Sequence, residues 1–201
     1  MPQPRKLHDR YFKQAKADGY VARSAYKLTE INEKKRVVRR NFKVLDLGCA
    51  PGSWLQVVDG IIGDRGVAVG VDLQKVQAHL SPRVHVLQAD AFTIDPQELL
   101  DLSNGLFDVV LSDMAPNTTG HGDDFLSVRL CRRVLELLPS VLVPGGNVVM
   151  KVLEGEEFPA LLKETKRVFR EGGATKPAAS RDVSREIFIV GTGYLGERNG
   201  R

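Results

Sequence analysis

The fold of this chain is decided by the stretch VLDLGCAPGSW at residues 44–54. An apolar strand runs into Asp46, a tight turn with Gly48, Pro51 and Gly52 follows, and residues 55–62 have the apolar character of a helix. A strand that leads through a glycine-rich turn into a helix presents backbone groups to a nucleotide-like ligand in open α/β sheets. The stretch therefore predicts a ligand site at the end of the first strand.

The spacing of the two glycines narrows the choice of ligand. It is Gly48-x-x-x-Gly52, whereas a helix that meets a pyrophosphate follows the pattern Gly-x-Gly-x-x-Gly. We therefore expect an adenosine ligand without a diphosphate, and S-adenosylmethionine (SAM) is the predicted cofactor. A dinucleotide and a purely structural turn are the alternatives at this point.

Apolar strand patterns alternate with helical patterns along the rest of the chain. We expect strands at residues 43–47, 67–72, 84–88, 107–113, 147–152, 174–176 and 186–191. Helices are expected at residues 22–35, 53–62, 96–102, 123–142 and 158–170. Such alternation is typical of a sheet with helices on both faces. The predicted fold class is α/β, a seven-stranded Rossmann-like sheet of the SAM-dependent methyltransferase type, mostly parallel and closed by an antiparallel hairpin.

The composition is that of a soluble globular protein. Of its 201 residues, 42% are hydrophobic and 27% are charged, and no apolar run approaches the about 20 residues of a membrane helix. The first residues lack the apolar core of a signal peptide, so we expect a cytoplasmic protein without membrane contact. The two cysteines and four histidines are scattered, which predicts neither a disulfide nor a metal site. No surplus apolar segment indicates an oligomer, and a monomer is expected.

The charge is distributed unevenly. Residues 1–43 carry 13 Lys and Arg against 4 Asp and Glu, whereas residues 44–201 carry 16 against 21. We divide the chain into a basic N-terminal arm, residues 1–20, and a single domain, residues 21–201. The net charge of +9 on residues 1–43 indicates a polyanionic partner such as nucleic acid. An ordinary solvated surface is the alternative.

Acidic residues follow successive strands. Asp72 lies 20 residues after Gly52, the separation at which a carboxylate binds a ribose diol in such units. Asp90 follows the third predicted strand, where its carboxylate can accept from an adenine amino group. The alternative for each is an ordinary polar strand end in a loop.

Four further charged residues occupy positions that a solvated surface does not explain. Asp113 and Lys151 end apolar strands, Lys27 lies on the first helix, and Glu186 opens the last strand. A buried lysine is costly unless it is paired, and Asp113 is the natural partner of Lys151. One structural ion pair would account for two of these residues, whereas four together indicate a reactive site.

Five motifs together resemble the FtsJ/RrmJ family of SAM-dependent RNA ribose 2'-O-methyltransferases. They are AYKL at residues 25–28, DLGCAPGSW at 46–54, SDMAPN at 112–117, VMKV at 149–152 and SRE at 184–186. The resemblance covers almost the whole chain and departs from the family pattern at Ser53, where a glycine is common. It is strongest to those members that methylate a uridine ribose in the A-loop of 23S rRNA within the large ribosomal subunit.

The resemblance implies a role for each site residue. The family's catalytic tetrad falls on Lys27, Asp113, Lys151 and Glu186, and Lys151 is expected either to take the proton of the ribose 2'-hydroxyl or only to orient it. The SAM-binding positions fall on Gly52, Trp54, Asp72, Asp90 and Asp113, with the Trp54 ring packing against the ligand. The RNA phosphates are expected to meet Arg23, Lys34, Lys35 and Arg36. A target that needs a 2'-hydroxyl excludes DNA.

Other functions are kept as alternatives. Relatives that methylate the tRNA anticodon loop share the same four residues. A non-catalytic RNA-binding ribosome-assembly factor would bind SAM without needing both lysines. A nucleotide-dependent oxidoreductase is disfavoured by the glycine spacing, and a methyltransferase for small molecules is disfavoured by the basic N-terminal segment.

Overall fold

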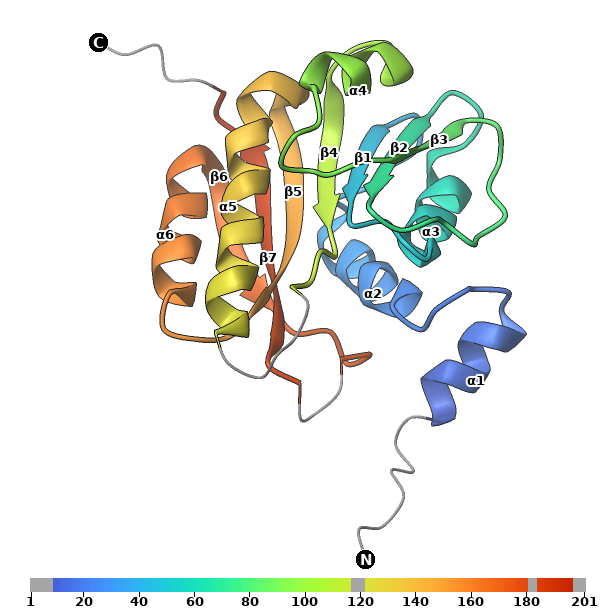
Figure 1. The fold of residues 1–201 in the computed structure, drawn as a ribbon, viewed down its shortest axis with the longest axis horizontal. Coiled ribbons are helices and arrows are strands. Elements are labelled where there is room, and N and C mark those ends of the chain that lie inside the picture. Colours follow the sequence, from blue (N-terminus) through green and yellow to red (C-terminus); the bar gives the residue numbers. More distant parts are fainter. Residues whose placement is uncertain (1–8, 117–121, 181–183, 197–201) are drawn as a thin grey trace, which may run out of the picture.

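The computed structural model describes residues 9–116, 122–180 and 184–196. The strands in this part of the chain are β1 (Lys43–Leu47), β2 (Val67–Asp72), β3 (Val84–Gln88), β4 (Phe107–Ser112), β5 (Leu142–Leu153), β6 (Phe169–Thr175) and β7 (Glu186–Tyr194). The helices are α1 (Asp9–Ala17), α2 (Ala25–Lys35), α3 (Ser53–Ile62), α4 (Pro96–Ser103), α5 (Asp123–Val141) and α6 (Phe158–Val168). Strands and helices alternate through most of the chain, as predicted (Figure 1).

The described strands form one sheet of seven strands in the order β3-β2-β1-β4-β5-β7-β6. Parallel pairings join β1 to β2, β1 to β4, β2 to β3 and β4 to β5. β7 pairs antiparallel with β5 on one side and with β6 on the other. The sheet is therefore mixed, and the prediction of a mostly parallel sheet is only partly right, because the last strand enters between two earlier ones.

Helices cover both faces of the sheet, as predicted. α4, α5 and α6 share one apolar core with the strands, to which Met150 of β5 contributes. α2 and α3 share the other core, to which Val149 contributes. Because side chains alternate along a strand, Lys151 lies on the same face of the sheet as Val149 and α2. Within the described residues, no helix has the length and apolar character that a membrane crossing requires.

The order of the strands reverses between β1 and β4, which are neighbours in the sheet. Open α/β sheets bind their ligands at such a switch point, outside the carboxyl ends of the strands. The arrow of β4 points to the edge of the sheet at which α5 begins (Figure 1). The turn at residues 48–52 follows β1 at this edge, so the stretch at residues 44–54 lies at the switch point.

One helix was absent from the sequence prediction, which treated residues 1–20 only as a basic arm. Residues 1–8 lie outside the described part of the chain, but Asp9–Ala17 form α1. Ala15 of this helix is only 2% exposed, and the ring centroid of Tyr11 lies 5.7 Å from that of Tyr26 on α2. Contacts with α2 thus stabilise α1, whose short and polar sequence does not by itself predict a helix.

Several boundaries also differ from the prediction: β6 begins at Phe169 rather than residue 174, and β7 ends at Tyr194 rather than residue 191. β5 begins at Leu142 rather than Asn147, because Leu142 pairs with Phe107 and the turn-forming residues 144–146 are accommodated as an irregularity in the strand. α6 ends at Val168 rather than Arg170, because Phe169 is already extended and opens β6. The buried Phe169 ring packs at 5.5 Å from the Tyr194 ring of β7, so tertiary packing overrides the local helical pattern.

Candidate active site

The register of the strands brings the four predicted tetrad residues to one place. Ser112 pairs with Met150, so the residues that follow them, Asp113 and Lys151, stand side by side. Lys151 in turn pairs with Phe188, and Glu186 lies two residues earlier on the same face of β7. α2 packs on this face and contributes Lys27 from its first turn.

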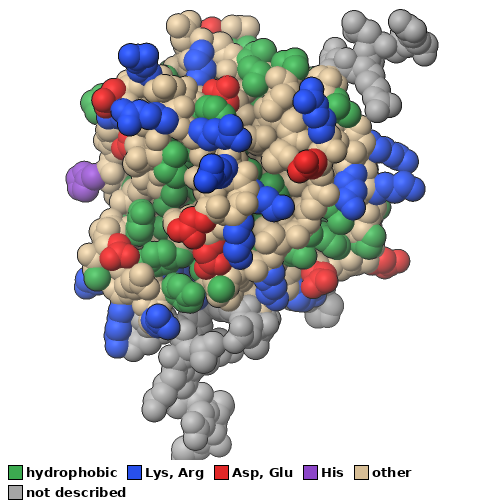
Figure 2. Space-filling view, turned by 180° about the vertical axis from the view of Figure 1, so that it is seen from behind, with side chains coloured by type: hydrophobic (Ala, Val, Ile, Leu, Met, Phe, Trp, Pro, Cys, Tyr) green, Lys and Arg blue, Asp and Glu red, His purple; other side chains and the backbone are tan. Residues whose placement is uncertain are grey.

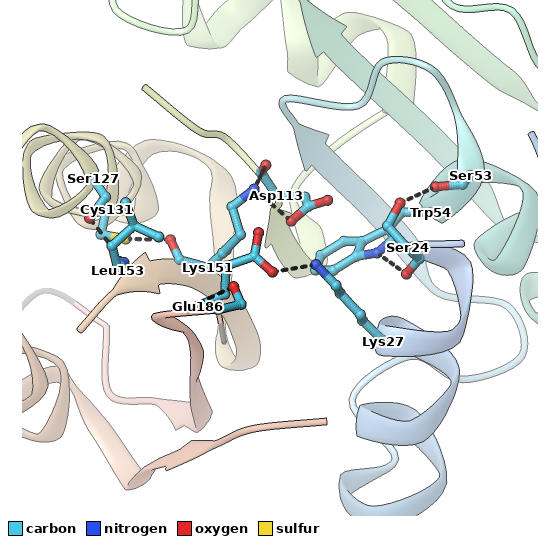
Figure 3. Close-up of polar contacts among 11 residues, drawn as sticks. Ser24, Lys27, Ser53, Trp54, Asp113, Ser127, Cys131, Lys151, Leu153 and Glu186 are labelled. Atoms are coloured by element: carbon cyan, nitrogen blue, oxygen red, sulfur yellow. Dashed lines mark hydrogen bonds and ion pairs between the residues drawn. The ribbon is translucent and has the colours of Figure 1, made fainter. Parts of the chain in front are cut away.

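The tetrad consists of two ion pairs. Lys151 Nζ lies 3.0 Å from Asp113 Oδ1 and donates to the main-chain oxygen of Asp113 at 2.6 Å. Lys27 Nζ donates to Glu186 Oε2 at 2.6 Å. In Figure 3 the four side chains point toward one another. Both lysine side chains are buried, at 7% and 8% exposure, so each ammonium depends on its carboxylate for compensation.

The electrostatics of Glu186 reflect this arrangement. Burial by itself raises the pKa of Glu186, but the charge and hydrogen bond of Lys27, together with Lys151 and the Ser184 side chain, outweigh burial and hold the pKa below its usual value. Glu186 is therefore ionised at neutral pH, and the folded state binds its proton less strongly than the unfolded state.

We expect Glu186→Gln to destabilise the protein in a pH-dependent way. At pH 7.5 the variant leaves the Lys27 ammonium buried without a counter-charge, which costs about 1–3 kcal/mol after allowance for the partial exposure of Glu186. The stabilisation from a depressed pKa is complete above the unfolded value of about 4.3 and is lost as the pH falls from there toward the lower folded value, so the difference from wild type should begin to shrink as the pH falls through 4. The free energy of unfolding of both proteins, from urea denaturation at pH 7.5, 5.5 and 4, gives this difference.

The control for this prediction is the double variant Lys27→Met/Glu186→Gln, which removes both charges and should recover part of the lost stability. A difference between wild type and Glu186→Gln that stays constant from pH 7.5 to pH 4 would contradict the prediction.

A cavity of about 560 Å³ opens beside the tetrad. Its polar lining includes three carboxylates and one lysine: Asp72, Asp90, Asp113 and Lys151. Gly48 and Met114 also line it, and the ends of β1 and β4 meet here so closely that a Cβ on Gly48 would lie 2.6 Å from Met114 Cγ. Only glycine therefore fits at position 48. We refer to this cavity as the carboxylate cavity.

Two of the carboxylates are held in place by backbone amides. Asp72 Oδ2 accepts from the Ala50 amide at 2.9 Å and Asp72 Oδ1 accepts from the Gln74 amide at 2.8 Å. Asp90 Oδ1 accepts from the Phe92 amide at 2.9 Å. Each carboxylate is thus oriented while keeping lone pairs that can accept from a ligand.

The structure places the other two predicted cofactor residues outside the lining of the carboxylate cavity. Gly52 caps α3, with φ 112°, and a Cβ there would lie 2.6 Å from Ala78. Trp54 is only 2% exposed, its Nε1 donates to the Ser24 carbonyl at 2.9 Å, and its ring packs 5.8 Å from Phe188. Trp54 thereby ties α3 to the start of α2, one turn before Lys27.

Three supporting groups were not identified from the sequence. The Ser53 hydroxyl lies 2.7 Å from the Ser24 hydroxyl and adds a second link between α2 and α3. The Cys131 thiol donates to the Lys151 carbonyl at 3.1 Å, and burial raises the pKa of Cys131 to about 12 despite the opposing charge of Lys151, so the thiol stays a donor. The sequence does not show these two contacts, because Ser53 lies 29 positions from Ser24 and Cys131 lies 20 positions from Lys151.

Asp46 is the third of these groups. It is fully buried on β1, and neither carboxyl oxygen has a hydrogen-bond partner among the described residues. Burial, with smaller effects from Asp113 and Asp72, raises the pKa of Asp46 well above its usual value. The carboxyl group of Asp46 is thus favoured in its neutral, protonated form near the carboxylates of Asp113 and Asp72.

Comparison with known proteins gives a consistent result. The family model "FtsJ-like methyltransferase" matches residues 20–194. "Ribosomal RNA large subunit methyltransferase E" of Desulfatibacillum aliphaticivorans is 44% identical over 185 residues, which are 91% of this chain and 89% of that protein. The protein of the same name from Syntrophobacter fumaroxidans is 44% identical over 187 residues, covering 92% and 95% of the two chains.

A solved structure shares the fold described above. The crystal structure of a protein from Plasmodium falciparum described as a ribosomal RNA methyltransferase superimposes with a TM-score of 0.77 at 26% identity. The match covers 89% of this chain and 100% of that one. With a family model that spans most of the sequence and relatives at this level of identity, the chain belongs to the FtsJ-like methyltransferase family.

Proposed function

We propose that this protein is a SAM-dependent RNA ribose 2'-O-methyltransferase that modifies a uridine in the A-loop of 23S rRNA within the large ribosomal subunit. The observation that carries the proposal is the paired tetrad of Lys27, Asp113, Lys151 and Glu186 beside a nucleotide-sized cavity, in a chain of this family. We further propose that residues 21–201 form the catalytic domain, and that the protein acts as a monomer in the cytoplasm.

The carboxylate cavity suits SAM better than a dinucleotide. Its volume of about 560 Å³ lies within the roughly 300–1,000 Å³ of small-molecule sites. Asp72, Asp90 and Asp113 against Lys151 make its lining acidic, which favours a sulfonium cation and repels a diphosphate. Asp72 would hold the ribose hydroxyls and Asp90 the adenine amino group. When bound, SAM supplies an electrophilic methyl group whose sulfur leaves as a neutral thioether.

The tetrad would prepare the ribose hydroxyl for this transfer. As an ammonium, Lys151 has three donors; one goes to the main-chain oxygen of Asp113 and the charge is paired with its carboxylate, so a donor remains to orient the 2'-oxygen. As the new O–CH₃ bond forms, the hydroxyl must lose its proton, and Lys151 would accept this proton only if it reacts as the neutral amine. The Lys27–Glu186 pair borders the same space and would hold the ribose in line, where orientation contributes to the rate.

Basic residues offer a path for the RNA backbone. Exposed cations continue from α2 toward β1, namely Lys34, Lys35, Arg36, Arg39 and Arg40. Lys and Arg side chains are spread over the face of the molecule opposite α5 (Figure 2). Phosphate contacts of this kind supply affinity and position rather than sequence specificity. In this proposal the specificity comes from the ribosomal context of the target.

The test is transfer of labelled methyl from SAM to three substrates: large subunits that lack the modification, protein-free 23S rRNA, and tRNA. We expect label in the large subunit, at a ribose in the A-loop. Label only in tRNA would support RNA methyl transfer but contradict the large ribosomal subunit as the substrate. Absence of label in all three, despite measurable SAM binding, would overturn the enzymatic proposal in favour of an assembly factor.

A further inference from the structure

A second cavity, of about 440 Å³, lies next to the carboxylate cavity. It is lined by Phe92, Phe125, Arg129, Arg132, Arg133 and Glu136. All but Phe92 come from α5, at the spacing that places side chains on one side of a helix. Phe92, in the loop after β3, lines both cavities. We call this second cavity the arginine shelf.

Two aromatic rings of the arginine shelf are exposed to solvent. Phe125 is 59% exposed and Phe92 is 37% exposed, although α5 buries a continuous apolar face elsewhere. The guanidinium carbon of Arg129 lies 5.1 Å from the centroid of the Phe92 ring. Aromatic rings combined with an arginine plane are the surfaces on which proteins stack unpaired bases of RNA. The exposure of the two rings is therefore not explained by the packing of the apolar core.

Two of the three arginines of the shelf are paired with carboxylates, and the third, Arg129, is exposed beside the rings. Arg132 is held by Glu157 at 2.6 Å and by Glu164 at 3.0 Å. Arg133 donates to the Ala91 carbonyl at 2.9 Å and lies 3.5 Å from Glu136. These contacts order the floor of the shelf, while the exposed Arg129 carries positive charge beside the rings, where a phosphate neighbouring a stacked base would lie.

The location links the arginine shelf to the reaction. Phe125 belongs to the first turn of α5, and α5 begins at the edge of the sheet to which β4 points (Figure 1). Asp113 and Lys151, at this same edge, line the carboxylate cavity with Phe92. We propose that Phe92, Phe125 and Arg129 stack an unpaired base that flanks the methylated nucleotide, on the other side of the sheet from the basic residues of α2, so that the RNA would cross the edge at which Asp113 and Lys151 lie; this rests on the proposed RNA methyltransferase function.

The test uses three variants of the full chain. Phe125→Ala removes an exposed ring with little risk to folding, Phe125→Trp keeps a stacking surface, and Leu126→Ala is the matched control, an exposed apolar neighbour (43%) outside the shelf lining. For large subunits that lack the modification we expect Phe125→Ala to raise KM by about 5- to 100-fold, with kcat and SAM affinity unchanged. Phe125→Trp and Leu126→Ala should match wild type.

Equal KM values for Phe125→Ala and Leu126→Ala would overturn the inference. So would a KM defect of Phe125→Ala on assembled subunits together with unchanged binding of a protein-free A-loop RNA oligonucleotide, since the partner would then be a ribosomal protein. Fluorescence of an A-loop RNA oligonucleotide carrying 2-aminopurine tests stacking without turnover: wild type should quench it and Phe125→Ala should not. This readout holds even where methyl transfer fails, so the two proposals can fail separately.

Discussion

Lys151→Met should lower kcat for methyl transfer by at least about 10²–10⁴-fold, the range over which a positioned proton-transfer group contributes. The substitution keeps most of the length of the side chain but removes the donor and the charge at the boundary between the tetrad and the carboxylate cavity. SAM affinity should change by less than about tenfold, because Asp72 and Asp90 remain to hold the cofactor. Single-turnover transfer and equilibrium SAM binding measure the two effects separately.

Lys151→Arg separates the two roles open to this residue. A guanidinium keeps the charge but cannot give up its proton near neutral pH. Activity in Lys151→Arg well above that of Lys151→Met would assign Lys151 an orienting role, whereas equal loss would assign it the proton. Lys163→Met, at an exposed position of α6, is the control and should behave as wild type. A kcat for Lys151→Met within tenfold of wild type would refute the catalytic assignment.

Gly48→Ala should destabilise the fold and abolish SAM binding. Gly48 has φ +77°, and its Cβ would lie 2.8 Å from the Met114 backbone nitrogen and Cα. The left-handed conformation and the forced displacement of β4 each cost about 1–3 kcal/mol. A total of about 2–6 kcal/mol corresponds to a Tm lower by about 4–24 °C in a chain of this size. Thermal unfolding and SAM binding are the measurements.

Gly60→Ala is the matched control for this substitution. Gly60 lies in α3, a Cβ there would meet nothing within 4 Å, and its φ is not positive. Because alanine favours a helix over glycine by about 0.5–1 kcal/mol, the control should be slightly more stable than wild type. A Gly48→Ala protein with the Tm of wild type would contradict the prediction, because it would mean that the ends of β1 and β4 can separate without loss of stability.

Much of the location of the site could be predicted from the sequence. Asp72, Asp90 and Asp113 each follow an apolar segment closely, and Lys151 ends another. Parallel strands bring their carboxyl ends to one edge of the sheet, so side chains at successive strand ends become neighbours without any knowledge of the contacts. The structure places all four around the carboxylate cavity. The hydrophobic periodicity and the succession of strands along the chain were sufficient here, because both can be read directly from the sequence.

The structure corrected the prediction where local signals conflict with packing. Residues 144–146 have strong turn propensity, yet Leu142 already pairs with Phe107. Phe169 continues a helical pattern, yet its ring is buried against Tyr194. Propensities of single segments are weak preferences, and burial of a large apolar side chain outweighs them.

Spacing along the chain was enough to predict the α/β alternation, the glycine turn after β1 and the strand ends that line the carboxylate cavity. The pairing of the charges and the set of side chains that line this cavity follow from the tertiary structure. Lys27 meets Glu186 across 159 positions because β7 inserts antiparallel beside β5, and Trp54 is buried toward Phe188 instead of lining the cavity. Strand register and the packing of helices on the sheet are set by contacts between distant segments, and no local pattern encodes them.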